Sequence, residues 1–250
     1  MLKIITLGVG LLAAASVWSA DSDLEAKLEA AMNADSRPAA DVARDRNRKP
    51  LQTLEFFGLQ SDMSVIELMP GGGWYTRLLA PVLKEKGKLH VAIGTGRVET
   101  RLLGSAEFAK SFVVTAKDAK TNRPKGSRFY ELEASSLDVE NADMVLTFRN
   151  YHNFGDAARA KVNDMAFAAL KKGGIYGVVD HTRRHMAPND TENRRRFDAV
   201  KAIKEIQAAG FEFVDFSTLH YRPDDELRYE VGRKSVTGNT DRWTLKFRKP

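Results

Sequence analysis

The stretch that decides the fold is Ser64-Val65-Ile66-Glu67-Leu68-Met69-Pro70-Gly71-Gly72-Gly73-Trp74-Tyr75-Thr76, an apolar run followed by three consecutive glycines. The run is typical of a short buried strand, and the residues after it favour the start of a helix. Glycine lacks a Cβ atom, so the backbone of the turn can approach a ligand closely. The first turn of the helix offers free N–H groups to the same ligand. The stretch therefore predicts a strand, a binding loop and a helix.

The residues around the glycines narrow the class of ligand. A triphosphate-binding loop ends in Gly-Lys-Ser/Thr, whereas Gly73 is followed by Trp74. A dinucleotide fingerprint matches Gly71 and Gly73, but Thr76 stands where its last small residue is expected. The acid that should follow about 20 residues later is also missing. Triphosphates and NAD therefore fit poorly, and a turn that serves packing alone is the plain alternative.

Outward from this loop, apolar runs alternate with helical patterns. We expect strands at 64–68, 88–93, 129–134, 142–148, 175–180, 211–217 and 243–247, and helices at 74–86, 156–171 and 191–209. This alternation predicts an α/β, Rossmann-like fold: a seven-stranded, mostly parallel sheet with helices on both faces and an antiparallel terminal hairpin. Ligands bind at the carboxyl ends of the strands in such sheets, where the glycine loop lies.

Residues 1–20 have the pattern of a secretory signal peptide. Lys3 precedes an apolar run, and small residues at Ser19 and Ala20 suit cleavage. The run is shorter than the roughly 20 residues that span a membrane, and an uncleaved anchor is the alternative. We expect a periplasmic or secreted protein with no stable membrane insertion after cleavage.

The remaining chain divides into two parts. Leucines at helical spacing and a helix from Pro50 to Gly58 predict an N-terminal helical cap at 21–60. Residues 61–250 form the main domain, which is long enough for one sizeable core.

Composition excludes some chemistry. The chain has no cysteine, so thiol catalysis, disulfides and cysteine metal sites are excluded. The net charge is +6, but apart from the run 194–196 the basic residues look scattered, so no nucleic-acid partner is expected. Arg195 and Arg196, expected on the helix 191–209, either grip an anionic substrate or form a solvated face.

The motif 65–76 resembles the first motif of the class I S-adenosylmethionine-dependent methyltransferases, an acid followed by a glycine turn. The segments 142–148, 168–176 and 242–247 are similar to the fourth strand, the approach to the fifth and the closing strand of that family. A narrower likeness, carried by 149–152, 180–181 and 196–198, is to predicted bacterial methyltransferases with signal peptides.

The resemblance implies S-adenosyl-L-methionine as cofactor and a small-molecule methyl acceptor. The residues it places at the cofactor are Glu67, Met69, Gly71, Gly73, Trp74, Glu133 and Asn150, with Glu133 near the adenine amine. Met69 replaces the family's first glycine, and Ile93 or Gly94 replaces the acid that binds the ribose hydroxyls. Glu99, from the next loop, is the expected substitute for that acid.

The expected catalytic residues follow the fourth and fifth strands. His152 is the candidate base, because histidine exchanges protons near neutral pH, and Asp180 or His181 would orient it. The same three residues could form a metal site, although no short metal-ligand spacing is present and none is predicted. They could also simply cap loops.

Other classes of function stay open at this point. They are a non-catalytic exported binding protein that keeps the methyltransferase fold, an oxidoreductase, and a nucleic-acid or surface binder. The oligomeric state is not predicted.

Overall fold

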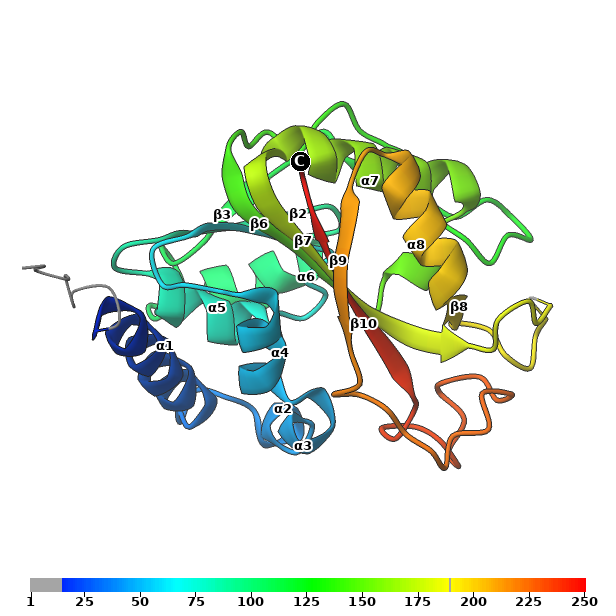
Figure 1. Ribbon diagram of the computed structural model, residues 1–250, viewed down its shortest axis with the longest axis horizontal. Helices are drawn as coiled ribbons and strands as arrows, with labels where there is room; N and C mark the ends of the chain where they lie inside the picture. The colour runs from blue at the N-terminus through cyan, green and yellow to red at the C-terminus, as the bar shows by residue number, and fades with distance from the viewer. Residues whose placement is uncertain (1–14, 189) are drawn as a thin grey trace, which may run out of the picture.

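The computed structural model describes residues 15–188 and 190–250, and Figure 1 shows a twisted sheet between helices. The strand order is β3-β2-β1-β6-β7-β10-β9. The strands are β1 (Ser64–Leu68), β2 (Lys88–Ala92), β3 (Val113–Thr115), β6 (Ala142–Phe148), β7 (Leu170–Arg183), β9 (Glu212–Ser217) and β10 (Arg242–Arg248). The first five pair in parallel, and β10 is antiparallel to both β7 and β9. The predicted α/β, mostly parallel sheet with an antiparallel end is confirmed.

Helices cover both faces of the sheet, as predicted. The helices are α1 (Ala15–Met32), α2 (Ala39–Val42), α3 (Asp45–Arg48), α4 (Pro50–Phe57), α5 (Thr76–Leu83), α6 (Gly96–Val98), α7 (Asp156–Ala169) and α8 (Ala199–Ala208), with a π-helical turn at Glu99–Leu103 and a 3₁₀ turn at Tyr151–Asn153. Side chains of β1 alternate between the two cores: Val65 packs with α1, α4 and α5, whereas Ile66 packs with α7 and α8.

The N-terminal helices share the core of the main domain. Leu28 of α1 and Leu54 of α4 are fully buried in the same cluster as Leu78 of α5. As expected, α4 begins at Pro50 and ends at Gly58, which has a φ of 81°. The division into a cap at 21–60 and a domain at 61–250 stays a prediction.

Two elements differ from the predictions. The third strand of the sheet is β3, whereas the predicted strand 129–134 contains β5 (Glu131–Glu133), which pairs with β4 (Lys120–Asn122) in a separate ribbon. The predicted helix 191–209 begins only at Ala199, after a short strand β8 (Phe197–Asp198) that pairs with β7. Arg195 has a φ of 63°, which a right-handed helix cannot accommodate, so Arg195 and Arg196 lie in a loop.

The predicted signal peptide lies largely outside the described residues, because the description begins at Ala15. Export therefore stays a prediction, which cell fractionation would test. Within the described chain, none of the helices is both long and apolar enough to cross a membrane.

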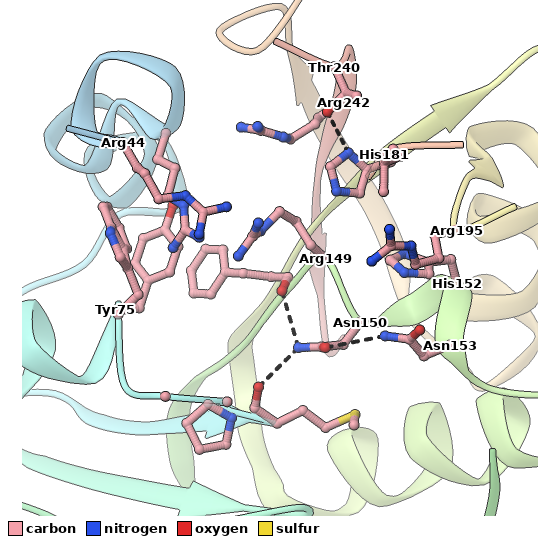
Figure 2. A pocket seen from close by; sticks show the side chains of 18 of the residues that line it. Arg44, Tyr75, Arg149, Asn150, His152, Asn153, His181, Arg195, Thr240 and Arg242 are labelled. Carbon is pink, nitrogen blue, oxygen red and sulfur yellow. Dashed lines mark hydrogen bonds between the residues drawn. The ribbon is translucent and has the colours of Figure 1, made fainter. Parts of the chain in front are cut away.

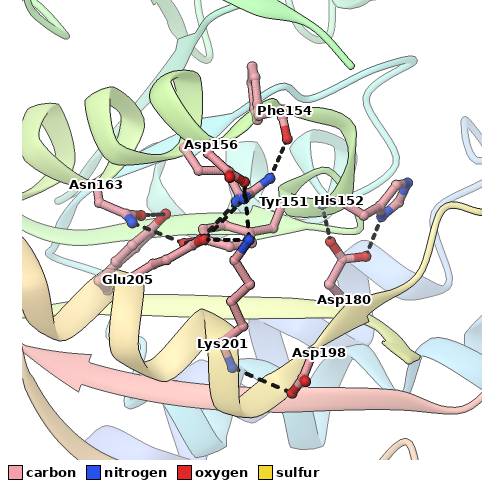
Figure 3. A network of polar contacts seen from close by, with 11 residues as sticks. Tyr151, His152, Phe154, Asp156, Asn163, Asp180, Asp198, Lys201 and Glu205 are labelled. Atoms are coloured by element: carbon pink, nitrogen blue, oxygen red, sulfur yellow. Dashed lines mark hydrogen bonds and ion pairs between the residues drawn. The ribbon is translucent and has the colours of Figure 1, made fainter. Parts of the chain in front are cut away.

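A buried polar network joins α7 to α8 and continues into the 3₁₀ turn (Figure 3). Arg159 Nε donates to Glu205 Oε2 at 2.7 Å, and the Tyr151 hydroxyl donates to the same oxygen at 3.0 Å. Asn163 Nδ2 donates to the Tyr151 hydroxyl at 3.0 Å. Satisfied buried networks of this kind hold their members in one arrangement. The network therefore fixes Tyr151, and with it the neighbouring His152.

Candidate functional site

The glycine loop lies where the strand order reverses, between β1 and its neighbours β2 and β6. Met69 has a φ of 50°; its N–H donates to the Ala92 carbonyl at 2.9 Å and its carbonyl accepts from Asn150 Nδ2 at 3.0 Å. The loop is thus tied to the ends of both adjacent strands. This is the position at which open α/β sheets bind their ligands.

Glycine suits the backbone at Gly73 and Gly71 for different structural reasons. Gly73 has a φ of 85°, and a Cβ there would lie 2.7 Å from Leu102 Cδ1, so the turn requires glycine. Gly71 has a φ of 60°, and nothing lies within 4 Å of where its Cβ would be. The open space beside Gly71 is the cradle that a ligand on this loop would occupy.

Two adjoining cavities open above the loop, with volumes of about 500 and 820 Å³. Both values are within the range of small-molecule sites. The residues that line both cavities are Met69, Gly71, Arg97, Asn150, His152, Asn153 and Arg195. Figure 2 shows that His152, Asn150 and Asn153 come from the segment after β6.

His152 and Asp180 form a hydrogen-bonded pair (Figure 3). His152 Nδ1 lies 2.6 Å from Asp180 Oδ1, and the His152 N–H donates to Oδ2 at 2.8 Å. The His181 N–H donates to Oδ1 at 2.7 Å. Because a carboxylate accepts and does not donate, Nδ1 carries a proton, and Nε2 is the acceptor in the neutral form of the ring. Of the two residues expected to orient His152, Asp180 is the one whose side chain contacts the ring.

His181 has a different environment from His152. Its Nδ1 lies 2.9 Å from the Thr240 hydroxyl, and its ring also lines the smaller cavity (Figure 2). Burial, and then the charge of Arg242, hold the pKa of His181 well below its usual value. The ring is therefore neutral at neutral pH, and His181 contacts Asp180 through its backbone N–H while its ring contacts Thr240.

Glu67 is buried at the end of β1, with 3% of its surface exposed. Its Oε2 accepts a hydrogen bond of 2.6 Å from the Thr76 hydroxyl. Removal from water raises the pKa of Glu67 to about 7, and the Thr76 hydrogen bond opposes that rise. Glu67 lines the smaller cavity, so its charge near neutral pH depends on what occupies that cavity.

The other predicted cofactor residues are placed unequally. Trp74 lines the smaller cavity, but its ring is covered by the Arg48 guanidinium at 4.2 Å and its Nε1 donates to the Asp41 carbonyl. Glu133 is exposed on β5 and lines neither cavity. Glu99 also lines neither cavity and accepts a hydrogen bond from Thr95.

The end of β2 carries no acid, as the sequence indicates. Ile93 and Gly94 occupy it with φ values of 61° and 65°, and Gly94 lines the larger cavity. Across the described residues, no three acid or histidine side chains come together in a way that could hold a metal ion.

Sequence reasoning considered Arg195 and Arg196 as ligands of an anion but missed the other arginines of the site. Those that line the two cavities are Arg44, Arg48, Arg97, Arg101, Arg123, Arg128, Arg149, Arg194, Arg195, Arg196 and Arg242, whereas the only carboxylates in these linings are Asp41 and Glu67. The basic residues are therefore not scattered. They come from segments far apart in sequence, and no motif in the chain signals that they converge.

Arg196 belongs to this lining but is already neutralised. Its guanidinium donates to both carboxylate oxygens of Asp225, at 2.8 and 2.9 Å, and to the Tyr229 carbonyl. It is 2% exposed, which corrects the expectation of a solvated helix face. Its role is to anchor the segment 218–241 against β7.

Three solved structures show what this architecture is similar to. A SAM-dependent methyltransferase from Aquifex aeolicus matches with a TM-score of 0.56 and 14% identity, over 90% of this chain and 98% of its own. The glycopeptide N-methyltransferase MtfA, complexed with S-adenosyl-L-homocysteine, matches with a TM-score of 0.53 and 13% identity, over 82% and 90%. The [4+2]-cyclase SpnF matches with a TM-score of 0.55 and 15% identity, over 91% and 93%.

The chain therefore has the fold of the class I S-adenosylmethionine-dependent methyltransferases. No protein-family model matches the sequence, and no curated protein sequence matches it significantly. Because the same architecture is also that of a cyclase, the fold does not by itself define a reaction.

Proposed function

We propose that this protein is an S-adenosylmethionine-dependent methyltransferase that acts on a small molecule. The observation that carries the proposal is the His152–Asp180 pair, because His152 lines the same two cavities as Gly71 at the reversal of strand order. The open space beside Gly71 and the buried Glu67 fit a ligand that lies along this loop. The predicted signal peptide adds export to the proposal.

The residues would divide the work as follows. When bound, S-adenosylmethionine supplies a methyl group on a positively charged sulfur. Asn150 binds the Met69 carbonyl and so fixes the glycine loop, and Met69 and Gly71 line the cavity in which the reactants would be positioned. His152 Nε2 accepts the proton that an oxygen or nitrogen acceptor loses as its bond to the methyl group forms. Asp180 holds the ring in the tautomer that can accept it.

A second candidate function has its own observation. The missing acid at Ile93–Gly94 and the many arginines of the cavities are unfavourable for a cofactor that carries positive charge. Both features favour a binding protein that keeps the fold without catalysis. The two functions differ in whether S-adenosylhomocysteine binds on the glycine loop.

Calorimetry with S-adenosylhomocysteine, the demethylated product, tests this difference. We expect binding to the protein, and we expect Gly71→Asn to weaken it about tenfold or more, because asparagine tolerates the left-handed backbone but fills the open space. The matched control is Gly173→Asn: Gly173 also has a positive φ of 78° and open space, but lies at the start of β7, away from the cavities. No heat at millimolar ligand would overturn the proposal. Equal affinity in the parent protein and both variants would show that the ligand does not bind at the glycine loop.

A further inference from the structure

Three guanidinium groups in the smaller cavity have no partner of opposite charge. Arg48 ends α3, Arg149 follows β6, and Arg242 begins β10. The Nε atom of each is buried without a hydrogen bond, and within the described chain none of the three pairs with a carboxylate. Arg48 is 3% exposed and Arg242 is 6% exposed. Buried charges are normally paired, so these three call for an explanation.

The fold holds these side chains in place by specific contacts. Arg48 lies on the face of Trp74, and Arg242 donates from Nη1 to the Asn47 carbonyl at 2.8 Å. Arg149 has a φ of 61°, and its N–H donates to the Val179 carbonyl at 2.6 Å. A bulky residue rarely adopts a left-handed backbone, and such conformations cluster at functional sites. In Figure 2, the side chains of Arg149 and Arg242 extend toward that of Arg44.

The nearby acids form no ion pair with this cluster. The charge of Asp180 acts on Arg149 and Arg242, but its oxygens contact His152 and the His181 N–H. Asp41 lies 3.8 Å from Arg77 Nε, and Glu67 is bound to the Thr76 hydroxyl. Burial, and then the charges of Arg149 and Arg44, lower the pKa of Arg48 to about 8. Burial also lowers the pKa values of Arg149 and Arg242 to about 10. Three buried like charges side by side are electrostatically unfavourable, and an anion between them would relieve the repulsion.

We propose that Arg48, Arg149 and Arg242 bind a phosphoryl group carried by the methyl acceptor. A phosphate monoester carries a charge of about −1.5 to −2 at pH 7 and three strong acceptor oxygens, whereas a carboxylate offers one charge and two oxygens. The planar fork of arginine suits phosphate oxygens. That this phosphoryl group belongs to a methyl acceptor rests on the proposed function. His152 and Asn150 line both cavities, whereas the three arginines line only the smaller one, so a phosphoryl group held there would position the acceptor beside His152.

Titration calorimetry of the full chain with inorganic phosphate tests the site. We expect one phosphate to bind per chain at neutral pH, with acetate about tenfold weaker or worse. Arg149→Gln and, separately, Arg242→Gln should each weaken phosphate binding about tenfold or more. The matched control is Arg183→Gln, because Arg183 also has a buried Nε without a partner but lines neither cavity.

Thermal unfolding without phosphate separates binding from a structural role. Because each variant removes one of several like charges, we expect the Tm of Arg149→Gln and Arg242→Gln to equal or exceed that of the parent protein. Weaker phosphate binding together with a lower Tm in both variants would show that the arginines stabilise the fold and do not form a binding site. Equal phosphate affinity in the control and the cavity variants, or acetate binding as tight as phosphate, would also overturn the proposal.

Binding of S-adenosylhomocysteine to the same samples distinguishes this inference from the proposed function. If both ligands bind together, both proposals stand. Phosphate binding without S-adenosylhomocysteine binding keeps the anion site and overturns the methyltransferase. S-adenosylhomocysteine binding without phosphate binding does the reverse. Competition between the two ligands would place the anion site within the cofactor site, which overturns its assignment to the acceptor.

Discussion

Glu67 is the residue whose chemistry the fold alters most. It lies between the buried apolar residues Ile66 and Leu68 of β1, so its carboxyl group leaves water and accepts one hydrogen bond from Thr76. Its raised pKa, about 7, means that the folded protein holds a proton there at a pH at which the unfolded chain has lost it. Stability therefore falls as the pH rises from about 4.5 to about 7.

The variant Glu67→Gln removes this titration and keeps an acceptor for Thr76. Between pH 5 and pH 7.5, the parent protein should lose up to about 3 kcal/mol of unfolding free energy relative to the variant. Urea unfolding of both proteins at the two pH values measures the difference. A parallel pH dependence in the two proteins would show that Glu67 titrates normally.

At the scale of elements, α8 begins where Asp198 caps it. Asp198 Oδ1 accepts from the N–H groups of Val200 and Lys201 at 2.9 and 3.4 Å. Its second oxygen accepts from the Met186 N–H at 3.0 Å and lies 2.8 Å from His185 Nδ1. One side chain therefore starts the helix and holds the preceding loop.

Replacing this cap gives a matched pair of variants. Asp198→Ala should lower the unfolding free energy by about 1–2 kcal/mol, because two N–H groups lose their acceptor. Asp198→Asn keeps an oxygen and should lose much less. Urea unfolding measures both changes. An equal loss of unfolding free energy in the two variants would show that the negative charge of Asp198 beside His185 matters more than the helix cap.

The elements that could be predicted are those with a strong local pattern. The apolar run of β1 and the glycines after it define the strand and turn within one residue. β3 has only three residues, Val113–Thr115, at the edge of the sheet, so it leaves too short a pattern to be recognised. The predicted helix at α8 was too long, because the polar residues before Asp198 have the composition of a solvated helix. The left-handed backbone of Arg195 cannot be inferred from the residue type.

At the scale of the whole molecule, the segment 218–241 is joined to the sheet by the buried Arg196–Asp225 pair. Thr240 from the same segment contacts His181, so this segment forms one wall of the smaller cavity. The joint therefore supports the shape of the site as well as the stability of the chain.

Arg196→Ala leaves Asp225 buried and unpaired. It should cost about 3–5 kcal/mol of unfolding free energy, and proteases should cut 218–241 faster. The control is Arg195→Ala, which removes a partly exposed pair with Glu230 worth about 0–1 kcal/mol. Urea unfolding and timed proteolysis measure both effects. Similar behaviour of the two variants would show that the buried pair does not anchor the segment.

The candidate site could be predicted only where its residues lie at the carboxyl ends of adjacent strands. His152 follows β6, and Asp180 and His181 lie in the last part of the neighbouring β7, so the parallel pairing of the two strands brings them to one edge. The arginine cluster gives no such signal, because Arg48, Arg149 and Arg242 meet only when three distant segments pack together. A rule based on one stretch of sequence cannot detect that meeting.

The same long-range assembly has a consequence for folding kinetics. Arg242 contacts Asn47 across 195 residues of sequence, and β10 enters between β7 and β9. Contacts of such high sequence separation close late and slow the search for the native state. The anion-binding cavity therefore exists only in the fully folded protein. A ligand that binds there stabilises the native state by mass action and does not stabilise partly folded chains.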